Sequence, residues 1–208
     1  VHADRTVTFG YIKKGLVLYP GASCAGKVIC RDIGFDPAAA EYIGLQYITY
    51  TKEDYKRLPK RYADSHKGTY GHVLVIAGSK NMAGAAYFSA LAAYRMGAGL
   101  VTLYTPESNR CILQQLLPEA VLKTYPDTAP DLSALSDQLN NYQAIILGPG
   151  LGQNAASENI VRTVTASDIK IPLIIDADGL NILSKNMEWL SKSTVPTVIT
   201  PHMKELSR

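Results

Sequence analysis

The sequence is poor in cysteine, and its cysteines are not arranged as metal ligands or disulfide partners. The 208 residues contain three, Cys24, Cys30 and Cys111, with no C-x-x-C pair and no histidine at a ligand spacing. Disulfide-stapled secreted scaffolds and zinc domains therefore do not fit the sequence. We expect a protein of a reducing compartment, the cytoplasm.

Long hydrophobic runs and an excess of charge are also absent. No apolar run approaches the roughly 18 residues of a membrane span, and the first residues do not form a secretory signal. Charged residues make up 19% of the chain and the formal net charge is only +3, so neither a membrane nor a nucleic acid is expected as a partner. With 47% hydrophobic residues, the chain can form a substantial core.

The two ends of the sequence indicate a piece of a longer polypeptide. The chain does not begin with Met, and its last residues, "VITPHMKELSR", pass from an apolar strand pattern into the beginning of a helix. A domain seldom ends at such a point. We therefore expect a fold that is truncated at the C-terminus.

The composition changes near residue 50, where we place a domain boundary between residues 1–49 and 50–208. Before it, short strand signals are separated by glycine and proline, at residues 6–9, 16–18 and 27–30. At the boundary, the Tyr-rich, charged stretch "YTKEDYKRLPKR" predicts a short helix and reads as a connector.

Residues 50–208 alternate apolar strands with helices. Continuous apolar runs predict buried strands at residues 72–78, 100–105, 144–148, 172–177 and 196–200. Helical patterns lie between them, at residues 85–99, 109–117, 156–165 and 180–184. Strands that are apolar on both faces and alternate with helices predict an α/β fold with a largely parallel sheet flanked by helices.

In an open parallel sheet, ligands bind at the carboxyl ends of the strands, so the residues after each strand are the candidate site. After the first strand, "GSKNMAGAA" opens a helix whose free N–H groups attract an anion, although its glycines also fit a plain tight turn. Its spacing is neither G-x-x-x-x-G-K-[ST] nor G-x-G-x-x-G, which excludes those two cofactor-binding loops.

Two further strand ends carry residues expected near a nucleotide. "GPGLG" places three glycines after a strand, among them Gly150, so that a ligand can approach the main chain closely; an ordinary turn rarely needs three. "DADGLN" supplies Asp176, Asp178 and Asn181, oxygen ligands of the kind that Mg²⁺ takes beside phosphates. Asp176 is the candidate metal ligand, whereas Asp178 fits a helix cap equally well.

A histidine, His202, stands at the end of the last predicted strand. Isolated histidines are usually surface or core groups, and His2, His66 and His72 fit that description. His202 differs in its location, because an imidazole at a strand end can hydrogen-bond a polar ligand or exchange protons near neutral pH.

Four motifs, in this order and spacing, closely resemble the ADP/ATP-dependent dehydratase of NAD(P)H-hydrate repair proteins, which has a ribokinase-like fold. They are the stretch from "KGTYGHVLVIAGSKNMAGAA" onward, "AIILGPGLGQ", "PLIIDADGLN" and "ITPHMKE", and they cover residues 50–208. Residues 1–49 resemble the final strands of the NAD(P)H-hydrate epimerase domain of the bifunctional members. The epimerase site residues would lie upstream of Val1.

The resemblance implies roles for individual residues. Ala85, Gly152 and His202 would line the hydrated nicotinamide substrate, and the aspartates of "DADGLN" would lie near the phosphates and Mg²⁺. The family typically reads "TPHPGE" where this sequence has "TPHMKE", so Met-Lys replaces Pro-Gly beside the histidine. The family's catalytic aspartate belongs to a later glycine-rich motif, beyond Arg208, so the catalytic residue stays unassigned.

The activity implied is a lyase reaction of metabolite repair. A phosphoryl group from ADP or ATP goes to the C6 hydroxyl of (S)-NAD(P)H hydrate, and loss of phosphate restores NADH or NADPH; the isolated piece is expected to be inactive. Two alternatives stay open: a sugar or vitamin-precursor kinase of the same superfamily, which "GSKNMAGAA" and "TPHMKE" fit less well, and a non-catalytic adenylate-binding module. A homo-oligomer is compatible with the sequence, but no apolar stripe specifies one.

Overall fold

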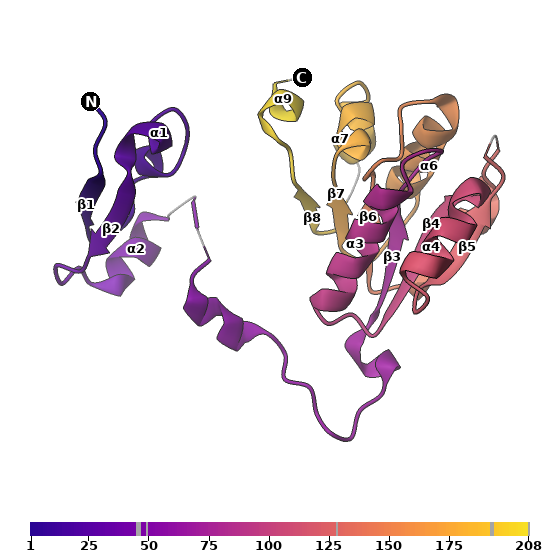
Figure 1. Cartoon of the computed structure of the whole chain (residues 1–208), viewed down its shortest axis with the longest axis horizontal. Coiled ribbons are helices and arrows are strands. Elements are labelled where there is room, and N and C mark those ends of the chain that lie inside the picture. The colour runs from indigo at the N-terminus through magenta and orange to yellow at the C-terminus, as the bar shows by residue number, and fades with distance from the viewer. Residues whose placement is uncertain (45–46, 49, 128, 192–193, 208) are drawn as a thin grey trace. The chain divides into compact units, whose positions relative to one another are not determined.

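The computed structural model describes residues 1–44, 47–48, 50–127, 129–191 and 194–207 (Figure 1). The chain divides into two compact units, Val1–Arg61 and Tyr62–Arg208, called unit 1 and unit 2 below. The assignment of residues 1–49 and 50–208 to two different domains stays a prediction, since compactness does not tell which domain a segment comes from. In the part of the chain that the structure describes, no helix is long and apolar enough to cross a lipid bilayer.

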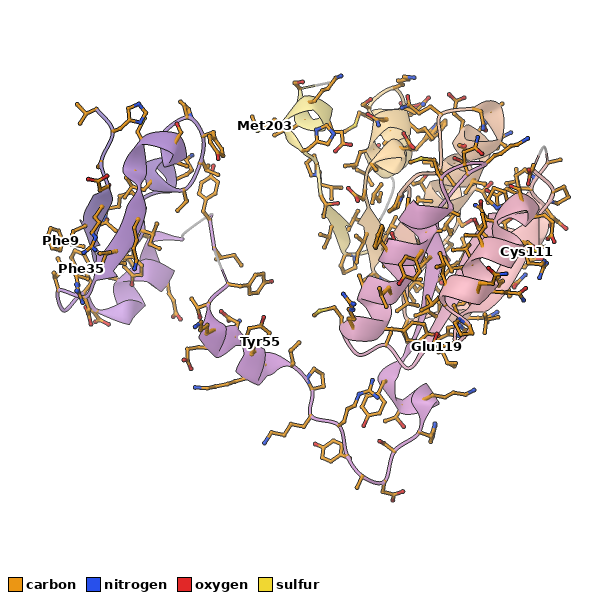
Figure 2. All side chains as sticks on the ribbon, in the orientation of Figure 1. Phe9, Phe35, Tyr55, Cys111, Glu119 and Met203 are labelled. Atoms are coloured by element: carbon orange, nitrogen blue, oxygen red, sulfur yellow. The ribbon has the colours of Figure 1, made fainter. Side chains whose placement is uncertain are left out.

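Unit 1 is built on two parallel strands, β1 (Arg5–Phe9) and β2 (Lys27–Arg31). Its short helices are η1 (Lys14–Leu16), α1 (Ala22–Ala25), α2 (Pro37–Ile43) and the connector η2 (Lys52–Arg57). At the end of β1 the chain turns at Gly10 with φ +69°, and a Cβ there would stand 2.1 Å from the ring of Phe35. Figure 2 labels Phe9 and Phe35 at this end of the unit.

The strand predicted at residues 16–18 was wrong. The N–H groups of Leu16, Val17 and Leu18 donate to the nearby carbonyls of Lys13 and Lys14. These bonds close a helical turn, η1, and leave no donor for a strand ladder.

Unit 2 contains a six-stranded sheet in which every neighbouring pair is parallel. Its strands are β3 (His72–Ile76), β4 (Leu100–Pro106), β5 (Val121–Tyr125), β6 (Ala144–Leu147), β7 (Leu173–Ile175) and β8 (Thr197–Ile199). The α/β fold with a largely parallel sheet is thereby confirmed. β5 was not predicted, because it lies at an edge and alternates exposed residues such as Lys123 with half-buried ones, with a single buried residue, Tyr125.

The order of the strands is β5-β4-β3-β6-β7-β8. From β3 the chain builds outward through β4 to β5, returns to β6 on the other side of β3, and continues to β7 and β8. The direction of winding therefore changes between β3 and β6. In doubly wound sheets this switch point, at the carboxyl ends of the strands, is where ligands bind.

Helices cover both faces of the sheet (Figure 1). α3 (Ala83–Arg95) and α4 (Arg110–Leu116) pack on the face that carries Val75 and Leu103. The opposite face, with Leu74 and Ile145, packs against buried residues of these elements: α5 (Leu132–Ser136), η5 (Leu139–Asn141), α6 (Ala155–Ala166) and α7 (Asp178–Leu183). Shorter helices complete the unit: η3 (Lys67–Tyr70), η4 (Glu107–Asn109), α8 (Met187–Ser191) and α9 (Met203–Leu206).

Candidate functional site

The loops after β3 and β6 meet at the switch point of the sheet. The N–H of Gly78 donates to the carbonyl of Pro149 at 2.8 Å, and the N–H of Gly148 donates to the carbonyl of Ile76 at 3.0 Å. Gly78 has φ +81°, a conformation that side chains of L-residues rarely adopt. The two candidate ligand loops are thus held together by their own backbones.

The glycine loop after β6 packs directly on the beginning of α3. A Cβ at Gly150 would stand 2.6 Å from the Cβ of Ala85, and the φ of Gly150 is +62°. A Cβ at Gly148 would stand only 2.2 Å from the carbonyl oxygen of Asp176. These two glycines are therefore required by packing within the protein, whether or not a ligand approaches them.

Gly152 differs from the other two glycines of this loop. Its φ is +79°, but the atoms nearest to an added Cβ are 3.8 Å away, among them Oγ of Ser79 and Oγ of Ser157. The residue is half-buried rather than buried. Of the three glycines in "GPGLG", it is the one that leaves room beside the main chain.

The carboxylate of Asp178 holds this loop. Oδ2 accepts a hydrogen bond from the N–H of Gly152 at 2.9 Å, and Oδ1 accepts from Nε2 of Gln153 at 3.2 Å. Nδ2 of Asn181 lies 3.4 Å from Oδ1. Asp178 is the first residue of α7 and not its cap, because the residue before it, Ala177, occupies the cap position with φ 50°. The helix-cap alternative for Asp178 was wrong.

Asp176 lies at the carboxyl end of β7, next to Asp178 in the chain. Its backbone N–H donates to the carbonyl of Leu147 at 3.1 Å, and its carbonyl accepts from the N–H of Gly179 at 3.1 Å. Its side chain is half-buried. Three or more His, Cys, Asp or Glu side chains placed to hold a metal ion are not found together among the described residues.

His202 stands at the beginning of α9, after the edge strand β8. Nδ1 accepts from the N–H of Lys204 at 3.2 Å, which places the ring proton on Nε2, and Nε2 lies 3.0 Å from Oε1 of Glu205. The side chain of His202 is 64% exposed. These contacts stay within residues 202–205, and no hydrogen bond or ion pair joins His202 to the glycine loop in the part of the chain that the structure describes.

Ala85, at the beginning of α3, and Gly152, in the loop after β6, lie at the switch point, whereas His202 follows β8, two strands away from β6. Figure 1 shows α9 and α7 at the same end of the sheet, where the strands finish. Met203, which stands where the family has proline, is 81% exposed and is labelled on α9 in Figure 2. The substitution therefore does not disturb the core of the unit.

Two buried residues that were not predicted from the sequence hold the loops by hydrogen bonds to their backbone carbonyls. Nδ2 of Asn109, which is 2% exposed, donates to Oγ1 of Thr105 at 2.9 Å and to the carbonyl of Ser79 at 3.3 Å. Oγ of Ser157, which is 3% exposed, donates to the carbonyl of Leu151 at 2.8 Å. Asn154 caps α6 by accepting from the N–H of Ser157, and this Asn-x-x-Ser spacing is the signal that could have revealed the second contact.

Comparison with known families and proteins finds a matching family and several relatives of this chain. A family described as NAD(P)H-hydrate dehydratase matches residues 73–208 of the chain. The bifunctional NAD(P)H-hydrate repair enzyme Nnr of Moorella thermoacetica is 34% identical over 216 residues, which cover 100% of this chain and 40% of that protein. The ADP-dependent (S)-NAD(P)H-hydrate dehydratase of Listeria monocytogenes is 38% identical over 154 residues, 73% of this chain and 53% of that protein.

Solved structures agree with the sequence relatives. The ADP/ATP-dependent NAD(P)H-hydrate dehydratase of Bacillus subtilis, co-crystallised with ATP/Mg²⁺, superimposes with a TM-score of 0.58 at 35% identity, over 76% of this chain and 54% of that one. A ribokinase-like superfamily protein of Enterococcus faecalis gives a TM-score of 0.66 at 29% identity, over 76% of this chain and 55% of that one. The ribokinase-like fold is thus confirmed, and the chain spans about 40% of the length of the first bifunctional relative that it matches.

Proposed function

Because the chain belongs to the NAD(P)H-hydrate dehydratase family, we propose that this protein restores NADH or NADPH from the (S)-hydrate in a reaction that depends on ADP or ATP. The proposal draws on relatives whose names state this activity. Its strongest structural support is the contact between Gly150 and Ala85, which brings the glycine loop onto the beginning of α3 at the switch point. Ligands of doubly wound sheets bind at such a point.

The proposed substrate wall consists of Ala85, Gly152 and His202. Ala85 and Gly152 have little or no side chain, so a flat nicotinamide ring can lie against the main chain there. His202 would supply a polar group, because its side chain is 64% exposed; the hydrate would compete with Oε1 of Glu205, which now lies 3.0 Å from Nε2. The role of the protein in this scheme is to position the hydrate and to exclude water from it.

A nucleotide with Mg²⁺ fits the remaining groups at these strand ends. Mg²⁺ in nucleotide sites is typically bound by one or two carboxylates together with phosphate oxygens and water. Asp176 is the carboxylate that we assign to it, since that of Asp178 already accepts hydrogen bonds from Gly152 and Gln153. When bound, the nucleotide would supply the phosphoryl group, and the ion would neutralise the negative charge on it. Asn181 and Gly150 are proposed to lie near the phosphates.

Residues 1–49 are proposed to be the end of an epimerase-like domain. The support is that the Moorella relative is named bifunctional and that the match to it extends over the whole length of this chain. The epimerase reaction itself is not assigned to any residue of this chain.

The dehydratase proposal can be tested with the gene product that contains these residues. Incubation with (S)-NADH hydrate, MgCl₂ and either ADP or ATP should regenerate NADH, followed by its absorbance and by chromatography of the nucleotides. Release of phosphate in equal amount is expected. Phosphorylation of a sugar or a vitamin precursor without NADH formation would replace this proposal with a kinase, and adenylate binding without any product would replace it with a non-catalytic binding module.

A further inference from the structure

A cavity lies at the β5 edge of unit 2, formed by residues other than those of the strand-end loops. It has a volume of about 490 Å³ and is bounded by residues of β3, β4 and β5, by residues 126, 129 and 130, and by α5 together with Asp131, Gln138 and Tyr142. Cavities that hold small molecules usually measure roughly 300 to 1,000 Å³. The cavity is therefore large enough for a compact ligand.

Aromatic rings form one wall of this cavity. The rings of Tyr104 and Tyr125 are stacked, with centroids 4.7 Å apart and planes at 29°. Tyr142 also lines it, and all three tyrosines are at least nine-tenths buried. Burial, and after it the negative charge of Asp131, raises the pKa of Tyr104 to about 12, and burial raises that of Tyr125 as well, so both phenols stay neutral hydrogen-bond donors at physiological pH.

The hydroxyl of Tyr104 has no hydrogen-bond partner within the residues that the structure describes. Tyr104 itself is only 7% exposed. A buried polar atom that lacks a partner is costly, and native structures contain few of them. An acceptor atom on a molecule bound in the cavity would provide the missing partner.

The positively charged side chain of Lys123 lines the same cavity. Lys123 lies two residues before Tyr125 on β5, so the alternation of the strand points both side chains to the same face. Its ammonium donates to Oε1 of Gln138 and lies 5.9 Å from the centroid of the Tyr142 ring. An ammonium has three donors, so Lys123 can bind an anion as well. The acidic group that lines the cavity, Asp131, already accepts from the N–H of Ala134 at the beginning of α5.

We propose that this cavity binds a small planar aromatic molecule that carries a carboxylate. The ring stacks on the tyrosine wall, and the carboxylate accepts hydrogen bonds from Lys123 and from the hydroxyl of Tyr104. Aromatic stacking favours a flat ring over a saturated one of similar size. A charge-assisted hydrogen bond from Lys123 favours the acid over its neutral amide. The inference does not depend on the dehydratase activity, since it uses none of the residues of that site.

Three probes test the proposal on the unmodified protein: naphthoate, naphthamide and decahydronaphthoate, with binding followed by ligand-observed NMR and by calorimetry. Naphthoate should bind saturably with one site per chain. The amide and the saturated acid should each bind at least about tenfold more weakly, the first because it lacks the charge and the second because it cannot stack. Equal affinity for all three probes, or no binding of naphthoate, would overturn the proposal without any variant being made.

Variants then locate the site. Lys123→Met and Tyr104→Phe should weaken naphthoate binding, the former by about tenfold or more. Lys170→Met removes a positive charge from an exposed position in the same unit and should leave binding unchanged. Gly152→Val tests whether naphthoate binds at the strand-end site instead. If binding were lost in Gly152→Val but unchanged in Lys123→Met, naphthoate would occupy the strand-end site, and the proposal would be wrong. The melting temperature of each variant shows whether it is folded.

Discussion

The N–H of Gly152 donates a 2.9 Å hydrogen bond to Oδ2 of Asp178, twenty-six positions later in the chain. This bond joins the loop after β6 to the first turn of α7. The other oxygen of the carboxylate accepts from the side chain of Gln153, so Asp178 holds the loop at two points. A residue predicted to lie near the phosphates therefore shapes the loop that is predicted to line the substrate.

Replacement of Asp178 should loosen the glycine loop. Asp178→Ala removes the acceptor of the half-buried Gly152 N–H and should lower the free energy of unfolding by about 1 to 3 kcal/mol. Asp178→Asn keeps one carbonyl acceptor and should lower it less. Urea unfolding can be followed by the fluorescence of Trp189, the single tryptophan of the sequence, which reports on unit 2.

A matched control for these variants is Asp168→Ala, which removes a carboxylate from an exposed position of unit 2. It should change the free energy of unfolding by less than about 0.5 kcal/mol. If all three substitutions destabilised the protein equally, the loss could not be ascribed to the contact with Gly152.

The sheet could be predicted from the sequence because its central strands are buried on both faces. Leu74 is 1% exposed and its neighbour Val75 is fully buried, so the strand reads as a continuous apolar run. β5 escaped prediction for the opposite reason. As an edge strand it exposes Val121 and Lys123, and its alternating pattern is short and mixed with polar residues.

The composition of the site loops could be predicted, but their contacts could not. "GPGLG" and "DADGLN" were identified as unusual strand ends, yet the bond between Gly152 and Asp178 depends on β6 and β7 being neighbours in the sheet. Strand order is set by tertiary packing and cannot be predicted from a local sequence pattern. Asn109 was missed because a buried asparagine at the start of a helix looks, in sequence, like an ordinary polar surface residue.

Gly150 is predicted to be intolerant of any side chain. Gly150→Ala would place a Cβ 2.6 Å from that of Ala85 in a residue whose φ is +62°. Backbone strain and overpacking together should lower the free energy of unfolding by at least about 2 kcal/mol. The same urea titration of Trp189 fluorescence measures the change.

Gly84→Ala is the matched comparison, since Gly84 lies within α3 and an added Cβ there meets no atom within 4 Å. Alanine is favoured over glycine in helices, so this variant should be more stable by about 0.5 to 1 kcal/mol. A loss of stability in Gly84→Ala as large as in Gly150→Ala would contradict the packing argument.

The proposed role of His202 predicts a defect in substrate binding. His202→Asn keeps a side-chain acceptor for the beginning of α9 but removes the imidazole. If the ring binds the hydrate, the KM for (S)-NADH hydrate should rise by about threefold to tenfold, as expected for one hydrogen bond. The affinity for the adenylate should stay unchanged in calorimetry. An unaltered KM would remove His202 from the substrate wall without affecting the assignment of Ala85 and Gly152.

His72 should make the stability of unit 2 depend on pH. Its Nε2 lies 2.8 Å from Oγ1 of Thr102 and its ring packs edge-on against Tyr142, with centroids 4.7 Å apart. Burial and the positive charge of Lys123 lower the pKa of His72. The unfolded chain, in which a histidine titrates near about pH 6.5, then binds more protons than the folded one, so the free energy of unfolding falls as the pH decreases through that value.

His72→Gln keeps a group that can hydrogen-bond to Thr102 but cannot take up a proton. The variant should therefore lose more stability relative to the parent at about pH 8, where the parent carries no penalty, than at about pH 5, where protonation already opposes folding. Unfolding by urea at the two pH values, read from Trp189 fluorescence, gives both differences. A larger loss at the acidic pH would mean that the folded protein favours the charged imidazole, and the packing of His72 against Tyr142 would need another explanation.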